Sequence, residues 1–361
     1  NDSTDFGGQR RATKTFMGIM ASALQMIENV MGKIAQSLLM PKVAPDWYAG
    51  TRRLTEFPEA AAESLLLMSF VTLPVPDLEV AMDFFTKGLN MKEGNEVDGA
   101  RVVQIGASQL RIVSSSSTDL AAWPGPFYLW VEDSKLTLSS CQAFEKASGC
   151  SVIQEVHHIK EEGAADAILL QDPAGQNLFV VNQAPVGGMA KTMRSVLPGT
   201  DKVSNALALL SLQHPIPTGE AGGVVRFYSH FLGAAMSKTK QGYALDFSLG
   251  KALHQTLTFV EDEDVQLPKD TPGEKLPEVC LYVVSMAKLK EAYDKCSEAG
   301  LVEGEVSWED VEKSREFSFS RCPDPSNKKI VLELRHRLRA PEHEQWPLPQ
   351  DLTTRAVSER P

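Results

Sequence analysis

An internal duplication limits the folds open to this chain more than any other feature of its sequence. Two Lys-Leu pairs, at 135–136 and 288–289, each follow an apolar run and lie about 153 residues apart. Two Asp-Pro pairs, at 172–173 and 324–325, lie about 152 residues apart. Near-constant offsets at several landmarks indicate two copies of one structural unit. A chain of 361 residues is long enough for two such units and additional segments.

Each copy repeats the order strand, helix and three strands. The first copy begins with an apolar strand over 67–75 and a helix capped by Asp77, followed by two strands joined by a turn at 106–107. The order then recurs over Phe127–Val131, Ser134–Ala147, Ser151–Val156, Ala167–Gln171 and Asn177–Val181. This alternation predicts an α+β architecture with mixed sheets. We expect each copy to close a cupped sheet of its own, so that the strands of Phe70 and Phe179 share one sheet.

The stretches that carry this order resemble the vicinal oxygen chelate superfamily, which includes glyoxalase I, extradiol dioxygenases and bleomycin-resistance proteins. In the first copy they are VTLPVPDLEVAMDFFTKGLNM, FYLWVEDSKLTLSSCQAFEKASG and LLQDPAGQNLFVV. In the second copy they are VVRFYSHFLGA, CLYVVSMAKLKEAYDKCSEAGL and CPDPSNKKIVLEL. The resemblance implies tandem domains over 65–185 and 205–340, each built from two βαβββ modules around a cavity. These motifs mark a fold more than an activity.

Three segments lie outside the two domains. They are an N-terminal arm over 1–64, a linker over 186–204 with several glycines, and an extended, proline-containing tail over 341–361. The chain starts at Asn1, which fits either a removed presequence or a trimmed boundary. We therefore expect the interior of an organelle, plastid or mitochondrion, with the cytoplasm as the alternative. No apolar run reaches the roughly 18–20 residues that cross a bilayer, so no transmembrane helix is predicted.

Superfamily members with metal chemistry place one ligand, usually His, Gln or Glu, on each of four strands. In the first domain the resemblance puts Phe70, Arg111 and Phe179 at three of these positions, and Pro126 or Phe127 at the fourth. A benzyl group cannot donate to a metal ion, and a guanidinium repels a cation. We therefore predict that the first domain lacks the metal of the superfamily.

The second domain retains some donors. Glu278 and Glu333 lie near ligand positions, and His254 or Gln255 lies near the fourth-strand position, depending on the register of that strand. The first-strand position falls in 206–210, where the sequence has no donor. Solvated carboxylates at strand ends are the ordinary interpretation. A partial divalent-metal site that uses Glu278, Glu333 and His254 is the alternative.

Composition argues against several other classes of function. A formal net charge of -11 argues against a nucleic-acid partner. No P-loop, G-x-S-x-G or G-x-G-x-x-G motif occurs, so nucleotide hydrolysis, serine hydrolysis and Rossmann-type cofactor binding have no support. The five cysteines include no CxxC pair and are expected to be free thiols. No catalytic residue is assigned.

Apolar side chains at spacings of three and four form a stripe in the arm, which predicts an amphipathic helix over about 16–40. Such a helix is marginal in water by itself and needs a covering surface. We predict that the stripe binds a protein partner; packing on the chain's own domains and binding to a membrane surface are the alternatives. The residues of the stripe are Met17, Met20, Leu24, Ile27, Met31, Ile34 and Leu38.

These features favour a non-catalytic accessory or scaffold subunit of a larger protein assembly, such as an energy-converting complex of an organelle. Its arm and tail would bind protein partners, and peripheral association with a membrane complex is compatible with this hypothesis. Two alternatives stay open. One is a metal-dependent, glyoxalase-like lyase or isomerase with its site in the second domain. The other is a metal-free module that binds a small molecule. No cofactor is predicted apart from the divalent metal of the first alternative.

Overall fold

A computed structural model describes residues 64–157, 167–182, 205–239, 242–248, 253–266 and 275–347. The first half of the chain supplies two modules. The elements of the first module are β1 (Leu65–Val75), α3 (Leu78–Asp83), the π-helical turn η1 (Phe84–Gly88), β2 (Lys92–Glu93), β3 (Arg101–Ile105) and β4 (Ser108–Ser114). The elements of the second are β5 (Phe127–Val131), α4 (Ser134–Ser148), β6 (Ile153–His157), β7 (Ala167–Gln171) and β8 (Asn177–Asn182).

The second half of the chain supplies two more modules. The elements of the third are β9 (Ala206–Pro217), α6 (Ala221–Phe231), β10 (Met236–Lys238), β11 (Gly242–Ser248) and β12 (His254–Asp262). The elements of the fourth are β13 (Glu278–Val283), α7 (Met286–Glu298), α8 (Trp308–Ser314), β14 (Glu316–Pro323) and β15 (Ile330–Arg339). In the fourth module α8 lies in the chain where the other modules have the first strand after their helix.

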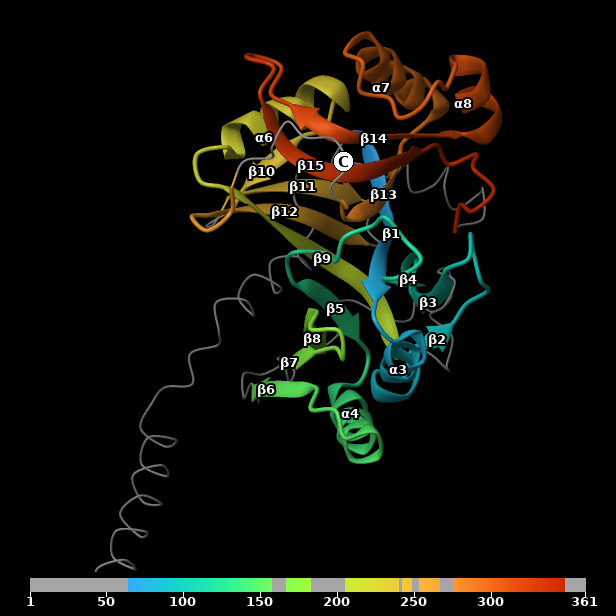
Figure 1. Ribbon diagram of the computed structural model, residues 1–361, viewed down its shortest axis with the longest axis vertical. Coiled ribbons are helices and arrows are strands. Elements are labelled where there is room, and N and C mark those ends of the chain that lie inside the picture. The colour runs from blue at the N-terminus through green and yellow to red at the C-terminus, as the bar shows by residue number, and fades with distance from the viewer. Residues whose placement is uncertain are drawn as a thin grey trace, which may run out of the picture. The chain divides into compact units, whose positions relative to one another are not determined.

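The strands form two mixed sheets, and each sheet draws on both halves of the chain (Figure 1). The β1 sheet has seven strands in the order β14-β15-β13-β1-β4-β3-β2. The β9 sheet has eight strands in the order β10-β11-β12-β9-β5-β8-β7-β6. β1 pairs antiparallel with β13, and β5 pairs antiparallel with β9. The first module therefore shares a sheet with the fourth, and the second shares a sheet with the third.

The predicted α+β class with mixed sheets is confirmed, and so is the recurrence of one order of elements in both halves of the chain. The prediction that the strands of Phe70 and Phe179 share a sheet is wrong, because Phe70 lies on β1 and Phe179 on β8. The reason is that the free edge of β1 can be covered by any strand that has a matching apolar register. Local sequence patterns do not tell which strand covers it.

The helices begin where short polar side chains cap them. Asp77 accepts a hydrogen bond from the Val80 N–H, and Asp133 accepts from the Lys135 and Leu136 N–H groups. Such caps satisfy amides that have no partner within the first helical turn. The predicted start of the first helix and of α4 is thus confirmed.

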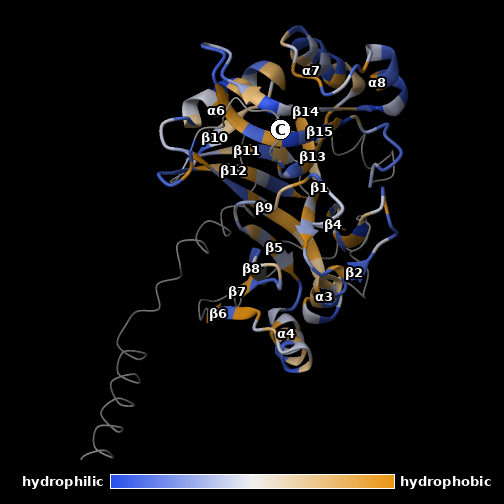
Figure 2. Cartoon of the chain, in the orientation of Figure 1, coloured by the Kyte–Doolittle hydropathy of each residue, from blue (hydrophilic) through white to orange (hydrophobic). Residues whose placement is uncertain are grey.

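Apolar packing joins the modules into one cluster of buried side chains. Figure 2 shows hydrophobic residues concentrated along β1 and β9, whereas α8 is largely hydrophilic. The two modules of the first half also contact each other through their helices. The ring centroids of Phe84 in η1 and Phe144 in α4 are 5.7 Å apart. All five cysteines are free thiols, as predicted. Among the described residues, no helix combines the length and apolar character needed to cross a bilayer.

Candidate functional site

The β1 sheet has one apolar face and one polar face. Val71, Leu73 and Val279 face the apolar cluster. Thr72 lies opposite Arg111 on β4 and opposite Glu278 on β13, and paired residues of adjacent strands share a face. Residues on β15 extend this polar face, because β15 runs parallel to β13 in a register that sets Arg335 beside Glu278, Arg337 beside Cys280 and Arg339 beside Tyr282.

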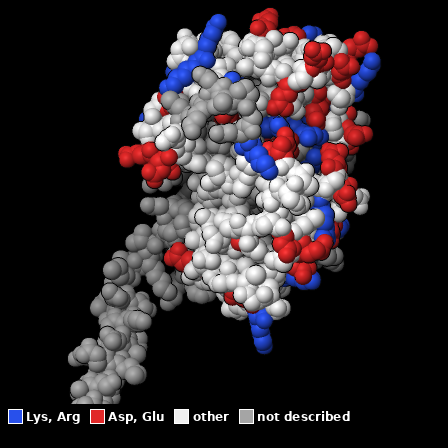
Figure 3. Space-filling view, viewed as in Figure 1, with Lys and Arg blue, Asp and Glu red and all other residues white. Residues whose placement is uncertain are grey.

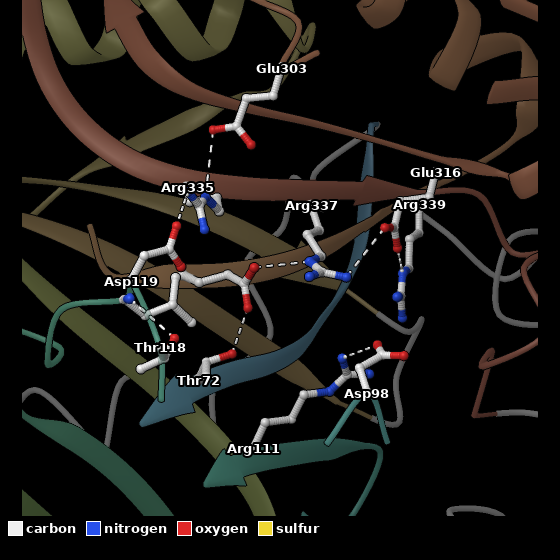
Figure 4. A network of polar contacts seen from close by, with 12 residues as sticks. Thr72, Asp98, Arg111, Thr118, Asp119, Glu303, Glu316, Arg335, Arg337 and Arg339 are labelled. Carbon is white, nitrogen blue, oxygen red and sulfur yellow. Dashed lines mark hydrogen bonds and ion pairs between the residues drawn. The ribbon is translucent and has the colours of Figure 1, made fainter. Parts of the chain in front are cut away.

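Glu278 lies at the centre of a hydrogen-bonded network on this polar face, around the side chains that Figure 4 shows converging from β1, β14 and β15. The Thr72 hydroxyl donates to Oε2 of Glu278 at 2.6 Å, and Arg337 Nε donates to Oε1 at 2.9 Å. Arg337 Nη1 also lies 3.5 Å from Oε1 of Glu316, and Oε2 of Glu316 accepts a hydrogen bond from Arg339 Nε. Burial lowers the pKa of Arg337, but the Glu278 and Glu316 carboxylates outweigh burial, so that its pKa is raised. Both oxygens of Glu278 are therefore engaged.

Arg111 and Arg339 lie over the ring of Phe70. Their guanidinium carbons are 3.5 Å and 5.3 Å from the ring centroid, within the range of a cation–π contact. Arg111 is buried, and its Nη1 lies 3.4 Å from Oδ2 of Asp98 while its Nη2 donates to Oε1 of Gln345 at 2.6 Å. Burial lowers the pKa of Arg111, and the neighbouring Arg339 lowers it further.

The structure brings together residues at predicted metal-ligand positions that the sequence analysis had assigned to different domains. Phe70 and Arg111 of the first domain lie on the same sheet as Glu278 and Glu333 of the second. Glu333 lies opposite Arg321 on β14, and its Oε1 is 3.3 Å from Arg321 Nε. An arginine is thus present at each of these positions. Phe70 lies beneath Arg111 and Arg339. Glu278 pairs with Arg337, and Glu333 pairs with Arg321.

His254 and Gln255 lie on the β9 sheet and point to opposite faces. Gln255 is fully buried and spans the two sheets, because its Oε1 accepts from the Met68 N–H at 2.9 Å while its Nε2 donates to the Leu209 carbonyl at 2.8 Å. His254 Nε2 lies 3.0 Å from Oδ1 of Asp246. Gln255 therefore joins the sheets, and His254 is buried beside one carboxylate.

The side chains at the ligand positions do not fit the metal that the resemblance implies. A guanidinium covers the Phe70 ring at 3.5 Å and would repel a cation there. Glu278 has a hydroxyl and a guanidinium on its two oxygens. The described residues also contain no group of three or more His, Cys, Asp or Glu arranged to hold an ion. No reaction step is therefore derived through a metal.

Sequence reasoning missed most of the arginine network. Arg335, Arg337 and Arg339 alternate with apolar or buried residues in the segment LELRHRLR, and a period of two sets all three on one face of β15. This alternation is the signal from which the three arginines could be predicted. The contributions of Glu316 and Gln345 depend on the fold and leave no comparable signal in the sequence.

The predicted partner-binding residues cannot be placed in the same way. The arm from Met17 to Leu38 lies outside the described residues, as do residues 348–361 of the tail. The described part of the tail ends at Pro347 and lies against the β1 sheet, where Trp346 contacts Tyr282 with ring centroids 4.7 Å apart.

Comparison with known proteins finds a family match within the first domain. Residues 67–180 match the family model of the Glyoxalase/Bleomycin resistance protein/Dioxygenase superfamily. A glyoxalase I variant from Zea mays is similar at 13% identity, with a TM-score of 0.49 over 81% of this chain and 96% of that chain. Lactoylglutathione lyase from Agrobacterium tumefaciens is similar at 16% identity, with a TM-score of 0.25 over 32% of this chain and 92% of that chain. No match was found among curated proteins.

Proposed function

We propose that this chain, whose residues 67–180 match the family model of the glyoxalase/bleomycin resistance protein/dioxygenase superfamily, is a non-catalytic accessory or scaffold subunit of a larger protein assembly. The paired modules would provide a rigid body, and the arm and tail would bind protein partners. We further propose the interior of an organelle as its location.

One observation supports the non-catalytic part of the proposal above all others. Arg111 covers Phe70 at 3.5 Å at the place where the superfamily would hold a metal ion and the substrate bound to it. A lyase or isomerase of this type needs an ion that polarises a carbonyl group and a base that moves a proton. Glu278, which could serve as ligand or base, is held by Thr72 and Arg337.

Two features support the assembly part of the proposal. The apolar stripe from Met17 to Leu38 needs a covering surface, and flexible methionine side chains suit an adaptable binding face. Acidic side chains are spread over the face of the molecule in Figure 3, in keeping with the net charge of -11. A partner with a complementary basic surface would associate rapidly with such a chain.

The native mass of the chain tests the proposal. A gentle extract of the source would be separated by size-exclusion chromatography, and the chain would be detected by mass spectrometry. We expect elution with much larger partners, and we expect Ile27→Asp within the stripe to release the chain. Gln25→Asp, which lies outside the stripe, is the matched control. Elution of the unaltered chain near its own 39.5 kDa would contradict the proposal.

A metal-free module that binds a small molecule is the second candidate, and a specific observation favours it over a metal-dependent enzyme. The polar face of the β1 sheet carries buried positive charge at Arg111 and Arg339. Such a face suits an anion better than a cation. A ligand that raises the melting temperature without any binding partner would favour this candidate over a scaffold.

A further inference from the structure

We propose that Arg111 and Arg339 form a binding site for a small carboxylate above Phe70, and that the side chain of Gln345 closes this site. The proposal does not rest on the scaffold function. It assigns a ligand class to a place where the superfamily resemblance implies a metal ion.

The geometry of the two guanidinium groups supports such a site. Both donate to the same oxygen, Oε1 of Gln345, with Nη2 of Arg111 at 2.6 Å and Nη1 of Arg339 at 2.8 Å. Both also lie over the Phe70 ring, which therefore forms the floor of the site. Two guanidiniums that converge on one acceptor present the pattern of donors that a carboxylate accepts best.

The balance of charge around Arg111 also supports the site. Arg337 and Arg339 are paired with the carboxylates of Glu278 and Glu316. Arg111 pairs with the carboxylate of Asp98, at 3.4 Å, on a side chain that is 60% exposed. Solvent screens such a partner strongly, so the buried charge of Arg111 is only partly compensated.

Arg111 also has a hydrogen-bond donor that is not used. Nε of Arg111 is buried and has no hydrogen-bond partner among the described residues. The oxygen that Arg111 Nη2 and Arg339 Nη1 share belongs to a neutral amide, which interacts with a guanidinium less strongly than a carboxylate does. A carboxylate in place of that amide would supply the missing charge.

Gln345 can leave the site without disturbing the sheet. It lies after the last strand, in a short turn held by local hydrogen bonds such as the one from the Gln345 N–H to His343 Nδ1 at 3.0 Å. The next residue, Trp346, contacts Tyr282 through its ring. The side chain of Gln345 thus occupies the place that the proposed carboxylate would take.

Substitutions at Gln345 test the proposal in the full chain by thermal unfolding. Gln345→Glu supplies the carboxylate within the chain and should raise the melting temperature by about 2 °C or more. Gln345→Ala vacates a space the size of acetamide. Its melting temperature should rise with added acetate more than with chloride at the same ionic strength, and more than with acetamide, the neutral analogue of acetate.

A double variant shows whether Arg111 is responsible for the response to acetate. The acetate response of Gln345→Ala should be lost when Arg111→Gln is added. If that double variant does not fold, the comparison of acetate with acetamide in Gln345→Ala still decides the question. Equal responses to acetate, chloride and acetamide would overturn the proposal, and so would a lower melting temperature in Gln345→Glu.

Discussion

Asp172 and Asp324 hold corresponding places in the two halves, yet their carboxylates have different partners. Arg226 donates to both oxygens of Asp324 at 2.9 and 2.5 Å. Oδ1 of Asp172 accepts only backbone N–H groups, and its Oδ2 has no hydrogen-bond partner among the described residues. The pKa of Asp324 is lowered by its hydrogen bond to Arg226, whereas burial raises the pKa of Asp172.

Because the two pKa values shift in opposite directions, ionisation of the two carboxylates is expected to change the stability of the fold in opposite directions. The stability that ionised Asp324 contributes is lost as the pH falls below about 4, while ionisation of Asp172 reduces stability as the pH rises through its raised pKa. Asp324→Asn should therefore lower the melting temperature at pH 7 more than Asp172→Asn does. Thermal unfolding of the two variants checks this expectation, and equal or reversed losses would contradict it.

Buried histidines predict a second dependence on pH. His336 is fully buried, with Nε2 2.7 Å from the Tyr228 hydroxyl, and burial lowers its pKa to about 3. Burial likewise lowers the pKa of His214 to about 4. Between these values and the ordinary pKa near 6.5 the unfolded chain binds more protons, so stability falls as the pH drops.

The test is urea unfolding at several values between pH 7 and pH 4. His336→Phe keeps a ring stacked on Phe319 and removes one titrating group. Its stability should be lower at pH 7, because the Tyr228 hydroxyl loses its partner, but should fall less steeply with acid. His230→Phe, at an exposed position, is the control. A slope in His336→Phe equal to that of the unaltered chain would refute the assignment.

At the scale of single elements, helix caps make a local and measurable contribution. The Asp133 carboxylate accepts hydrogen bonds from the N–H groups of Lys135 and Leu136 at 2.9 and 3.0 Å. Asp133→Ala should lower the free energy of unfolding by about 1 kcal/mol. Lys135→Ala, at an exposed position in the same turn, should change it by less than about 0.5 kcal/mol. Urea denaturation checks both values, and equal effects would show that the cap contributes nothing.

Elements of this kind were predictable because their causes are local. The sequence predicted β5 and β7 with their observed bounds and α4 to within one residue, since apolar alternation and an N-cap lie within each segment. The partner of β1 was not predictable, because β13 lies about 200 residues further along the chain. The acceptor that Arg111 shares with Arg339 likewise comes from Gln345, far away in the sequence.

At the scale of the whole molecule, the modules pair across the two halves of the chain, so the sheets of each half are completed by strands of the other. β1 is covered on one edge by β13, and β5 is covered on one edge by β9. Residues 64–185 alone would expose both edges, and exposed central edges pair with other chains. We expect this half to form dimers or aggregates, which light scattering after size exclusion would detect. A folded monomer with cooperative unfolding would contradict the observed strand order.

The same pairing sets Glu278 on β13 in one sheet with the strands of Phe70 and Arg111, and the proposed function requires that no metal ion binds there. The most direct test is metal content by mass spectrometry, after the full chain has been equilibrated with Ni²⁺, Zn²⁺ and Mn²⁺ and separated from free ions. The side chains at this place predict far less than one ion per chain for each metal. One ion per chain that is lost in Glu278→Gln would contradict the account and restore a glyoxalase-like enzyme as the better hypothesis.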